Sequence, residues 1–234
     1  MSKVKDIRLK VIPSKIANRF VKKWHYSGKV VPNSQLHFGA FLDGQLHGVM
    51  QYGNSIDKSK TIGLVDTGLD KNEGWNSFLE LNRMAFDDYL PKNSESRCIS
   101  VSISLLKRNA PHVKWILSYA DGTQCGDGAI YRASGFALTG LKKNKTILEW
   151  NGEIIADKTL NNPNYKKKGI SAGYAKKNGA KPLKGYQLRY IYLIDKSCKL
   201  TVPVIPYEKI DEVGAGMYKG EKISILERQN ASIA

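Results

Sequence analysis

The pattern of apolar and polar positions along the chain predicts strands that alternate with helices. Short apolar runs, some of them alternating with polar residues, are typical of strands. Such runs lie in residues 7–12, 35–53, 76–86, 112–121, 136–140, 145–157 and 186–195. Helices are expected in residues 13–26, 93–111 and 126–135. This order predicts an α/β or α+β fold in which helices flank a central sheet.

Two dipeptides that favour tight turns divide two of these apolar runs. Asp43-Gly44 and Asn151-Gly152 each stand between two short apolar stretches, so we expect a hairpin at each place. Residues 76–86 are predicted to form a strand, although their length would also suit a helix.

Two of the predicted helices have recognisable features. Residues 13–26 show helical spacing, and their expected core face consists of Ile16, Phe20, Val21 and Trp24. Residues 93–111 begin with a capping residue, carry small side chains in the first turns and end in basic residues before a proline.

A chain of 234 residues is most simply one domain. We expect residues 1–150 to form its core, and residues 151–234 to add a basic extension that completes the same domain. Ligands of such sheets usually bind at strand ends near helix N-termini.

The formal net charge of +16 is the strongest signal in the composition. The chain has no apolar run long enough to span a membrane, and its first residues lack an apolar signal region, so membrane insertion and secretion are not expected. Three widely spaced cysteines form neither a disulfide framework nor a zinc motif. A cytoplasmic protein with a polyanionic partner fits these features best.

Positive charge is densest in residues 158–190, which contain nine basic residues and no acidic one. Lysines can displace counterions from phosphates, and the interleaved tyrosines can stack on bases. The alternative is a flexible, solvated loop that charge keeps soluble. Contacts with nucleic acid are expected from Lys166, Lys167, Lys168, Lys176, Lys177, Lys181 and Lys184.

Two motifs resemble those of the GNAT superfamily of N-acetyltransferases. The segment "RCISVS" places Arg97, Ser100 and Ser102 where that superfamily has the Q/R-x-x-G-x-G/A motif, which binds the pyrophosphate of acyl-CoA at the start of a helix. Serine departs from the usual glycine. The segment "IYRASGF" resembles the superfamily's "lYeklGF", which implies that Tyr131 lies beside the thioester sulfur and protonates the leaving thiolate.

A narrower resemblance covers roughly residues 20–140. The segments "HYSGKVVPNSQLHFGAF", "FLELNRMAF" and "ADGTQCGDGAIYRASGF" are similar to the Mom family of phage and prophage DNA-modification proteins. The resemblance implies a GNAT-like enzyme of the bacterial host cytoplasm that converts the exocyclic amine of adenine in double-stranded DNA to a carbamoylmethyl derivative, which blocks restriction. It also implies acyl-CoA and iron as cofactors.

This reaction would place a CH2 group on nitrogen, whereas plain acyl transfer leaves a carbonyl carbon there. Either the donor presents an electrophilic CH2 group, or an acyl group is transferred and then rearranged with gain of nitrogen. Iron would help the second route, because Fe(II) prefers histidine and carboxylate ligands and keeps open positions. Both routes stay open at this point.

Polar residues at the ends of predicted elements are the candidate site residues. A histidine at a helix C-terminus also interacts well with the helix dipole, an aspartate before glycine also forms turns, and a tyrosine at a strand end also packs. The candidate catalytic residues are His25, Tyr26, Tyr52, Ser118, Asp121 and Tyr131. The candidate iron ligands are His25, Tyr26 and Asp121.

Three hypotheses follow. The first is an adenine-modifying transferase that flips its base out of the duplex. The second is an ordinary acyl-CoA-dependent acetyltransferase that acts on a protein or a nucleic-acid-associated substrate. The third is a DNA-binding protein on an inactive acetyltransferase scaffold.

Overall fold

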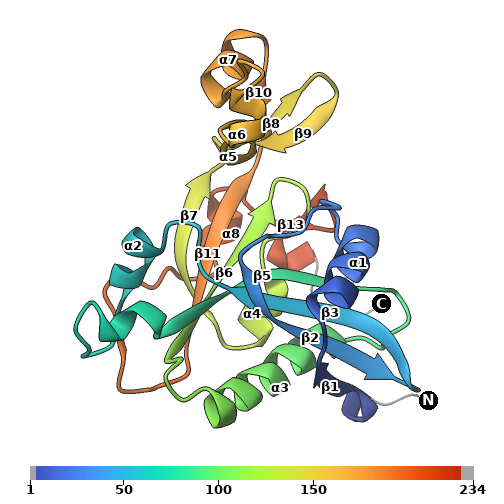
Figure 1. Ribbon diagram of the computed structural model, residues 1–234, viewed down its shortest axis with the longest axis vertical. Helices are drawn as coiled ribbons and strands as arrows, with labels where there is room; N and C mark the ends of the chain where they lie inside the picture. Colours follow the sequence, from blue (N-terminus) through green and yellow to red (C-terminus); the bar gives the residue numbers. More distant parts are fainter. Residues whose placement is uncertain (1–3, 228–234) are drawn as a thin grey trace. The chain divides into compact units, whose positions relative to one another are not determined.

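The computed structural model describes residues 4–227, and its largest feature is a mixed sheet of seven strands (Figure 1). The strand order across the sheet is β1-β2-β3-β5-β6-β11-β7. Helices pack on this sheet, so the predicted fold class, a mixed α/β sheet flanked by helices, is confirmed. The strands are β1 (Arg8–Val11), β2 (Ser34–Leu42), β3 (Gln45–Gly53), β5 (Phe78–Phe86), β6 (Trp115–Gly122), β7 (Ala137–Lys143) and β11 (Tyr186–Leu193).

Both hairpins predicted from turn dipeptides are present. Asp43 and Gly44, between β2 and β3, have φ angles of 50° and 78°. Asn151 and Gly152 form the second turn with φ angles of 52° and 77°. Two consecutive residues with positive φ are what the favoured two-residue hairpin turn requires.

Strands β5 and β6 form a parallel pair at the centre of the sheet. Their register runs from Phe78 opposite Trp115 to Leu81 opposite Ser118, and it ends there although both strands continue. The Ser118 hydroxyl donates a hydrogen bond to the Leu81 carbonyl over 3.0 Å. A side-chain hydrogen bond therefore joins the two strands at their last paired residues.

Helix α1 (Ser14–Trp24) packs on β2, β3 and β5 (Figure 1). Ala17 and Val21 are fully buried and belong to one core cluster with Val49 of β3 and Ala85 of β5. The next long helix is α3 (Ser94–Asn109), which follows β5 in the chain, and the short helix α4 (Ala129–Ala133) follows β6.

The predicted core face of α1 was partly wrong. Ile16 and Trp24 are 47% and 39% exposed, and Phe20 is half-buried. The face that meets the sheet is centred on Ala17 and Val21 instead. The small side chain of Ala17 gives little hydrophobic signal in the sequence, although it allows the helix to approach the strands closely.

Contacts divide the chain into two compact units that interleave along the sequence. The first unit comprises the chain up to Tyr119 together with Gly128–Thr139 and Arg189–Pro206. The second comprises Ala120–Asp127, Gly140–Leu188 and the described residues from Tyr207 onward.

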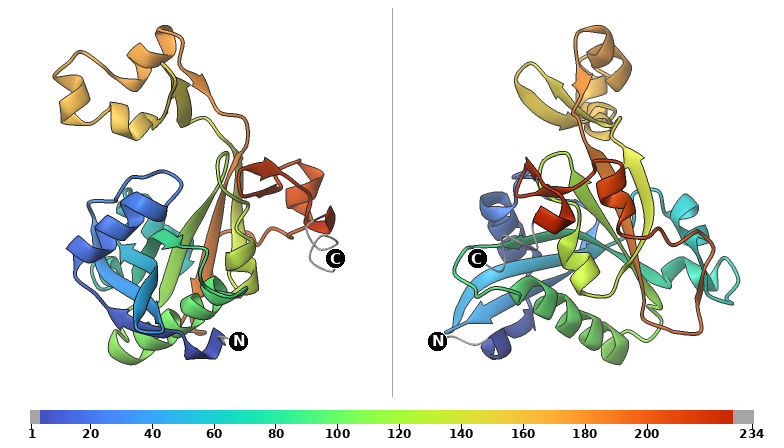
Figure 2. Two further views of the ribbon diagram at one scale, coloured as in Figure 1. Left: turned by 90° about the vertical axis from the view of Figure 1, so that its right-hand side faces the viewer. Right: turned by 180° about the vertical axis from the view of Figure 1, so that it is seen from behind.

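The basic segment, residues 158–190, is folded, whereas the alternative that its sequence left open was a flexible, solvated loop. Three short helices lie with a three-stranded sheet of order β10-β8-β9, and Figure 2 shows these helices grouped with the β8–β9 hairpin. The elements are β8 (Ile147–Trp150), β9 (Glu153–Ala156), α5 (Asp157–Leu160), α6 (Pro163–Lys166), α7 (Ala172–Lys177) and β10 (Lys181–Pro182). Their shared core consists of Leu148, Ile155, Leu160, Ala172, Ala175 and Ala180.

The remaining elements are short. None of the helices within residues 4–227 combines the length and the apolar character that a membrane span requires. These short elements are η1 (Val4–Asp6), α2 (Lys58–Thr61), η2 (Ile62–Leu64), β4 (Val65–Asp66), η3 (Glu73–Asn76), β12 (Lys199–Leu200), α8 (Lys209–Glu212), β13 (Met217–Tyr218) and β14 (Glu221–Lys222).

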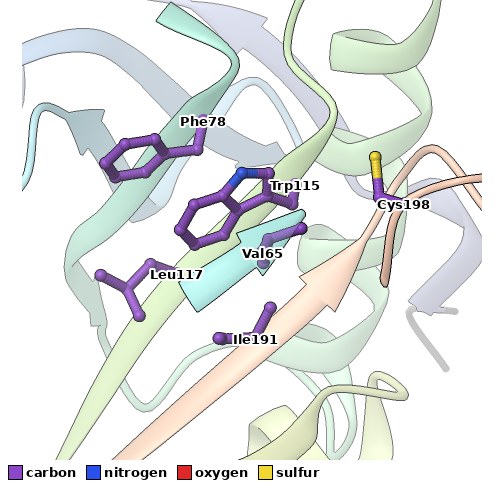
Figure 3. Packing of buried hydrophobic residues seen from close by; sticks show 6 residues of the cluster. All are labelled: Val65, Phe78, Trp115, Leu117, Ile191 and Cys198. Carbon is purple, nitrogen blue, oxygen red and sulfur yellow. The ribbon is translucent and has the colours of Figure 1, made fainter. Parts of the chain in front are cut away.

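A cluster of buried side chains fixes the start of the parallel pair (Figure 3). The rings of Phe78 and Trp115 stack with centroids 4.3 Å apart and planes inclined by 14°. Leu117, Ile191 and Val65 complete the contact, and all of these side chains are at most 5% exposed. The stacked pair therefore holds β5 and β6 together where their register begins.

We expect Phe78→Ala to lower the free energy of unfolding by about 3–5 kcal/mol, because it removes a buried ring and leaves a cavity beside Trp115. Urea denaturation followed by circular dichroism measures the change. The control Ile56→Ala removes a side chain that is 68% exposed, and we expect it to cost less than about 0.5 kcal/mol. Equal losses for the two variants would contradict this description of the core.

Candidate active site

Tyr52 and Ser102 join strand β3 to helix α3 inside the first unit. Their hydroxyl oxygens lie 2.6 Å apart, and both side chains are fully buried. Burial raises the pKa of Tyr52, and nearby Tyr131 and Cys98 raise it further, although the hydrogen bond to Ser102 acts in the opposite direction. Tyr52 is therefore a neutral phenol at physiological pH.

The hydrogens of this pair can be assigned by counting donors. The Ser102 hydroxyl donates its single hydrogen to the Ile99 carbonyl over 2.8 Å. The hydrogen between the two side chains must then come from Tyr52. The Tyr52 hydroxyl can consequently only accept a further hydrogen bond. It is better suited to a positioning role than to giving a proton to a leaving group.

Tyr131 lies in the short helix α4 among other aromatic rings. Its ring centroid is 5.3 Å from that of Tyr190 and 5.5 Å from that of Phe136, and the residue is 9% exposed. Helix α4 begins after Gly128, which has a φ of 85° and on which a Cβ would lie 2.4 Å from the Tyr190 ring. Glycine at this position therefore allows α4 to approach β11.

His25 and Tyr26 are adjacent at the end of α1. His25 caps the helix C-terminus, and its Nδ1 accepts a hydrogen bond from the Ser27 amide over 3.2 Å and lies 2.8 Å from the Ser27 hydroxyl. The His25 and Tyr26 ring centroids are 4.3 Å apart, and Tyr26 is 48% exposed. Accepting from the amide requires an unprotonated Nδ1, which leaves Nε2 as the ring donor.

Asp121 belongs to the second unit, where its carboxylate organises the glycine-rich loop. It accepts hydrogen bonds from the Thr123 amide over 3.0 Å, from the Thr123 hydroxyl, from Gln124 Nε2 over 3.0 Å and from Gln187 Nε2 over 2.8 Å. Its carbonyl also accepts from the Cys125 amide over 3.0 Å. This is the geometry of a turn-forming aspartate, the alternative that the sequence left open.

Two glycines allow the backbone beside Asp121 to pack closely. A Cβ on Gly185 would lie 2.2 Å from the Gly122 carbonyl oxygen, and Gly185 has a φ of 136°. A Cβ on Gly122 would lie 2.8 Å from the Tyr186 carbonyl oxygen. Glycine is therefore needed at both places, because the two backbone segments pack too closely for a side chain to fit between them.

The predicted pyrophosphate motif lies inside α3, so the expectation that it opens the helix was wrong. The helix begins at Ser94, three residues before Arg97. Arg97 and Ser100 are exposed, whereas Ser102 is fully buried and bonded to Tyr52. Ser102 is therefore placed for packing between α3 and β3, and a surface ligand does not reach it.

The iron site implied by the resemblance does not fit the residues of this structure. Within residues 4–227, no three histidine, cysteine, aspartate or glutamate side chains gather closely enough to hold a metal ion. Desolvation raises the pKa of the Cys125 thiol, and the nearby Asp121 carboxylate raises it further.

The sequence missed a polar group on neighbouring strands of the first unit. Tyr119 on β6 is 44% exposed, and partial desolvation raises its pKa; Glu80 on β5 raises it further, and Arg189 on β11 acts in the opposite direction. Arg189 is held by Thr139, since its guanidinium donates to the Thr139 hydroxyl over 3.1 Å and to its carbonyl over 2.7 Å. Every second residue of a strand lies on the same face of the sheet, so the sequence could have placed Tyr119 on the face of β6 that also carries Trp115 and Leu117.

Asn82 is a second residue that the sequence did not single out. It directly follows Leu81, where the register of the parallel pair ends. Its Oδ1 accepts a hydrogen bond from the Ser34 hydroxyl over 2.8 Å, while its Nδ2 is buried and has no hydrogen-bond partner among the described residues. A buried amide hydrogen without a partner is costly, so it suits contact with an acceptor atom of a ligand.

We expect Asp121→Ala to lower the free energy of unfolding by about 1–3 kcal/mol, because several loop donors lose their acceptor. Asp121→Asn keeps an acceptor oxygen in the same place and should cost less than about 1 kcal/mol. Chemical denaturation of both variants measures the difference. A loss for Asn as large as that for Ala would contradict the turn-forming role and favour a role that needs the charge.

Comparisons with known proteins find a matching protein family and a similar protein of known name. The model of the Mom protein family matches residues 6–209. The methylcarbamoylase Mom of Escherichia phage Mu is 34% identical over 199 residues, which cover 83% of this chain and 78% of that protein.

Similar solved structures include a Bacillus subtilis acetyltransferase in complex with CoA, with 10% identity, a TM-score of 0.43 and coverage of 80% of this chain and 98% of that one. Another is the Escherichia coli ribosomal-protein-S18-alanine N-acetyltransferase, with 10% identity, a TM-score of 0.45 and coverage of 81% and 94%. These structural similarities are weak, and the family assignment rests on the sequence. Because the family model covers most of its length, the chain belongs to the Mom protein family.

Proposed function

We propose that this protein is a methylcarbamoylase, a transferase that converts the exocyclic amine of adenine in DNA to its carbamoylmethyl derivative. The family match over residues 6–209 is the observation that carries this proposal. The 34% identity to the phage Mu methylcarbamoylase supports the same activity. The net charge of +16 suits a polyanionic substrate such as DNA.

The reaction forms a bond between the adenine nitrogen and a CH2 carbon, and the amine gives up one hydrogen. The exocyclic amine is a weak nucleophile, because its lone pair is delocalised into the purine ring, so the donor carbon must be activated. In duplex DNA the amine also takes part in base pairing. We therefore propose that the enzyme acts on double-stranded DNA and flips the adenine out of the stack.

Roles for the candidate residues follow from their hydrogen-bond capacity. Tyr131 is proposed as the acid that protonates the leaving group. Tyr52 is fully buried and already donates to Ser102, so its proposed role is to hold β3 against α3 and thereby position the residues that contact the substrate. The buried Nδ2 of Asn82 can donate to a carbonyl oxygen, such as that of the transferred carboxamide.

Acyl-CoA remains a proposed cofactor. Arg97 is exposed near the start of α3, where its guanidinium can bind a phosphate, and Ser100 is exposed one turn further along. Glu95 in the first turn opposes an anion there, and Ser102 lies out of reach. When bound, acyl-CoA would supply an activated acyl group. Plain transfer of that group would leave a carbonyl carbon on the adenine nitrogen, so the CH2 carbon of the product requires the transferred group to be rearranged with gain of nitrogen.

Protection of phage or prophage DNA from restriction is the proposed purpose. A substituent on the exocyclic amine of adenine lies on the major-groove edge of the base, where proteins read sequence by direct hydrogen bonds. The carbamoylmethyl group would block those contacts for enzymes with unrelated recognition sites that contain adenine.

Mass spectrometry of nucleosides from the DNA of cells that express the protein tests the proposal. We expect a deoxyadenosine in which a CH2–CO–NH2 group replaces one hydrogen. Tyr131→Phe should reduce this product by about 100-fold or more, because it removes the proposed acid and keeps the ring. The control Tyr89→Phe changes a tyrosine that is 58% exposed and should leave the product unchanged.

An unmodified nucleoside profile would overturn the proposed function. An acetylated deoxyadenosine would also overturn it, in favour of an ordinary acetyltransferase. Full product from Tyr131→Phe would move the proton donor to another residue.

A further inference from the structure

The second unit contains a segment with an unusual charge, Gly140–Leu188, which we call the lysine-rich segment. It contains eleven lysines, three acidic residues and no arginine. All eleven lysines are exposed, and none of them forms an ion pair within the described part of the chain. They are Lys142, Lys143, Lys145, Lys158, Lys166, Lys167, Lys168, Lys176, Lys177, Lys181 and Lys184.

These lysines stand on a folded scaffold with a core of its own, formed by Leu148, Leu160 and Ala175 among others. Asn144 closes the start of the segment, because its buried side chain donates to the carbonyls of Ile147 and Leu183 over 2.9 Å each. The same side chain accepts from the Ile147 amide over 3.0 Å. A scaffold fixed in this way presents its charges without the entropic cost of ordering a loop.

An exposed aromatic ring lies among the lysines of α7. Tyr174 is 47% exposed, and its ring meets that of Trp150 edge to face, with centroids 6.3 Å apart and planes at 81°. Trp150 is itself fixed, because its Nε1 donates to the Asn178 carbonyl over 3.1 Å. Lys176 and Lys177 follow Tyr174 in the same helix. A ring held in place beside cations is typical of surfaces that stack on unpaired bases.

We propose that the lysine-rich segment is a DNA-binding module that contacts phosphates without reading sequence, and that Tyr174 stacks on a base that has left the duplex. The identification of the nucleic acid as DNA rests on the proposed function. Lysine neutralises phosphates as a point charge, whereas the commonest specific contact with a guanine edge is a bidentate one from arginine, which the segment lacks. The module therefore supplies affinity, and base selection takes place elsewhere.

The salt dependence of DNA binding tests the phosphate contacts. Fluorescence anisotropy with a labelled duplex measures affinity over a range of salt concentrations. We expect the triple variant Lys166→Gln, Lys167→Gln, Lys168→Gln to bind at least about 10-fold more weakly at low salt, and the slope of log affinity against log salt to fall by roughly 2–3. The matched control Lys71→Gln, Lys107→Gln, Arg108→Gln removes the same charge from exposed positions in the first unit and should change the slope by less than about 1.

Equal effects of the two triple variants would overturn the proposal, because they would show that only total charge matters. Tighter binding to anionic phospholipid vesicles, or to duplex RNA, than to duplex DNA would overturn it as well. Circular dichroism melts of both variants show that they are folded, so a loss of binding is not mistaken for unfolding.

The stacking contact has its own test. A duplex with one unpaired adenine should bind Tyr174→Ala about 5-fold or more weakly than the unaltered protein, while Tyr174→Phe keeps the ring and the affinity. A fully paired duplex should show a smaller loss for Tyr174→Ala. Equal losses on the two duplexes, or an equal loss for the phenylalanine variant, would overturn the stacking role.

Failure of this inference is distinguishable from failure of the proposed function. If modified adenine forms but the lysine triple variant binds DNA as tightly as the unaltered protein, only the module is wrong. If the protein binds DNA through these lysines but no modified adenine forms, the module stands and the proposed function falls.

Discussion

The short parallel pairing of β5 and β6 is the constraint on which the rest of the first unit depends. It begins at the stacked rings of Phe78 and Trp115 and ends at Leu81 and Ser118, where the Ser118 hydroxyl donates a hydrogen bond to the Leu81 carbonyl. Backbone groups beyond a lost register need other partners. The end of this pairing is therefore a natural place for ligand atoms, and Asn82, with its unpartnered Nδ2, lies directly beside it.

The buried candidate catalytic residues and the lysine-rich segment belong to different parts of the chain. Tyr52, Ser118 and Tyr131 are buried residues of the first unit, where low polarity strengthens hydrogen bonds and burial raises the pKa of Tyr52. The lysine-rich segment belongs to the second unit and keeps all its lysines in water. Buried, neutral side chains suit proton transfer to a leaving group, and a solvated cationic surface suits a polyanion. This division is consistent with an enzyme whose substrate is one base of a long polymer.

Local signals predicted most elements, whereas features set by tertiary contacts were missed. Asp43-Gly44 and Asn151-Gly152 fix their own backbone, so both hairpins were visible in the sequence. The buried face of α1 depends on how closely the helix approaches the sheet, and the folding of the basic segment depends on small alanines that carry little hydrophobic signal. The capping residue predicted the start of α3 correctly, whereas the acetyltransferase-like motif at Arg97 begins three residues inside the helix, because a motif match fixes residue types and not the point at which hydrogen bonding begins.

The central claim is that a new carbon–nitrogen bond forms at the exocyclic amine of adenine. Tandem mass spectrometry on DNA whose adenine amine carries a heavy nitrogen isotope tests it most directly, after reaction in cells that express the protein. The account predicts a fragment in which the carbamoylmethyl group stays attached to the labelled nitrogen. A substituent on a ring nitrogen, on another base or on the sugar would contradict it.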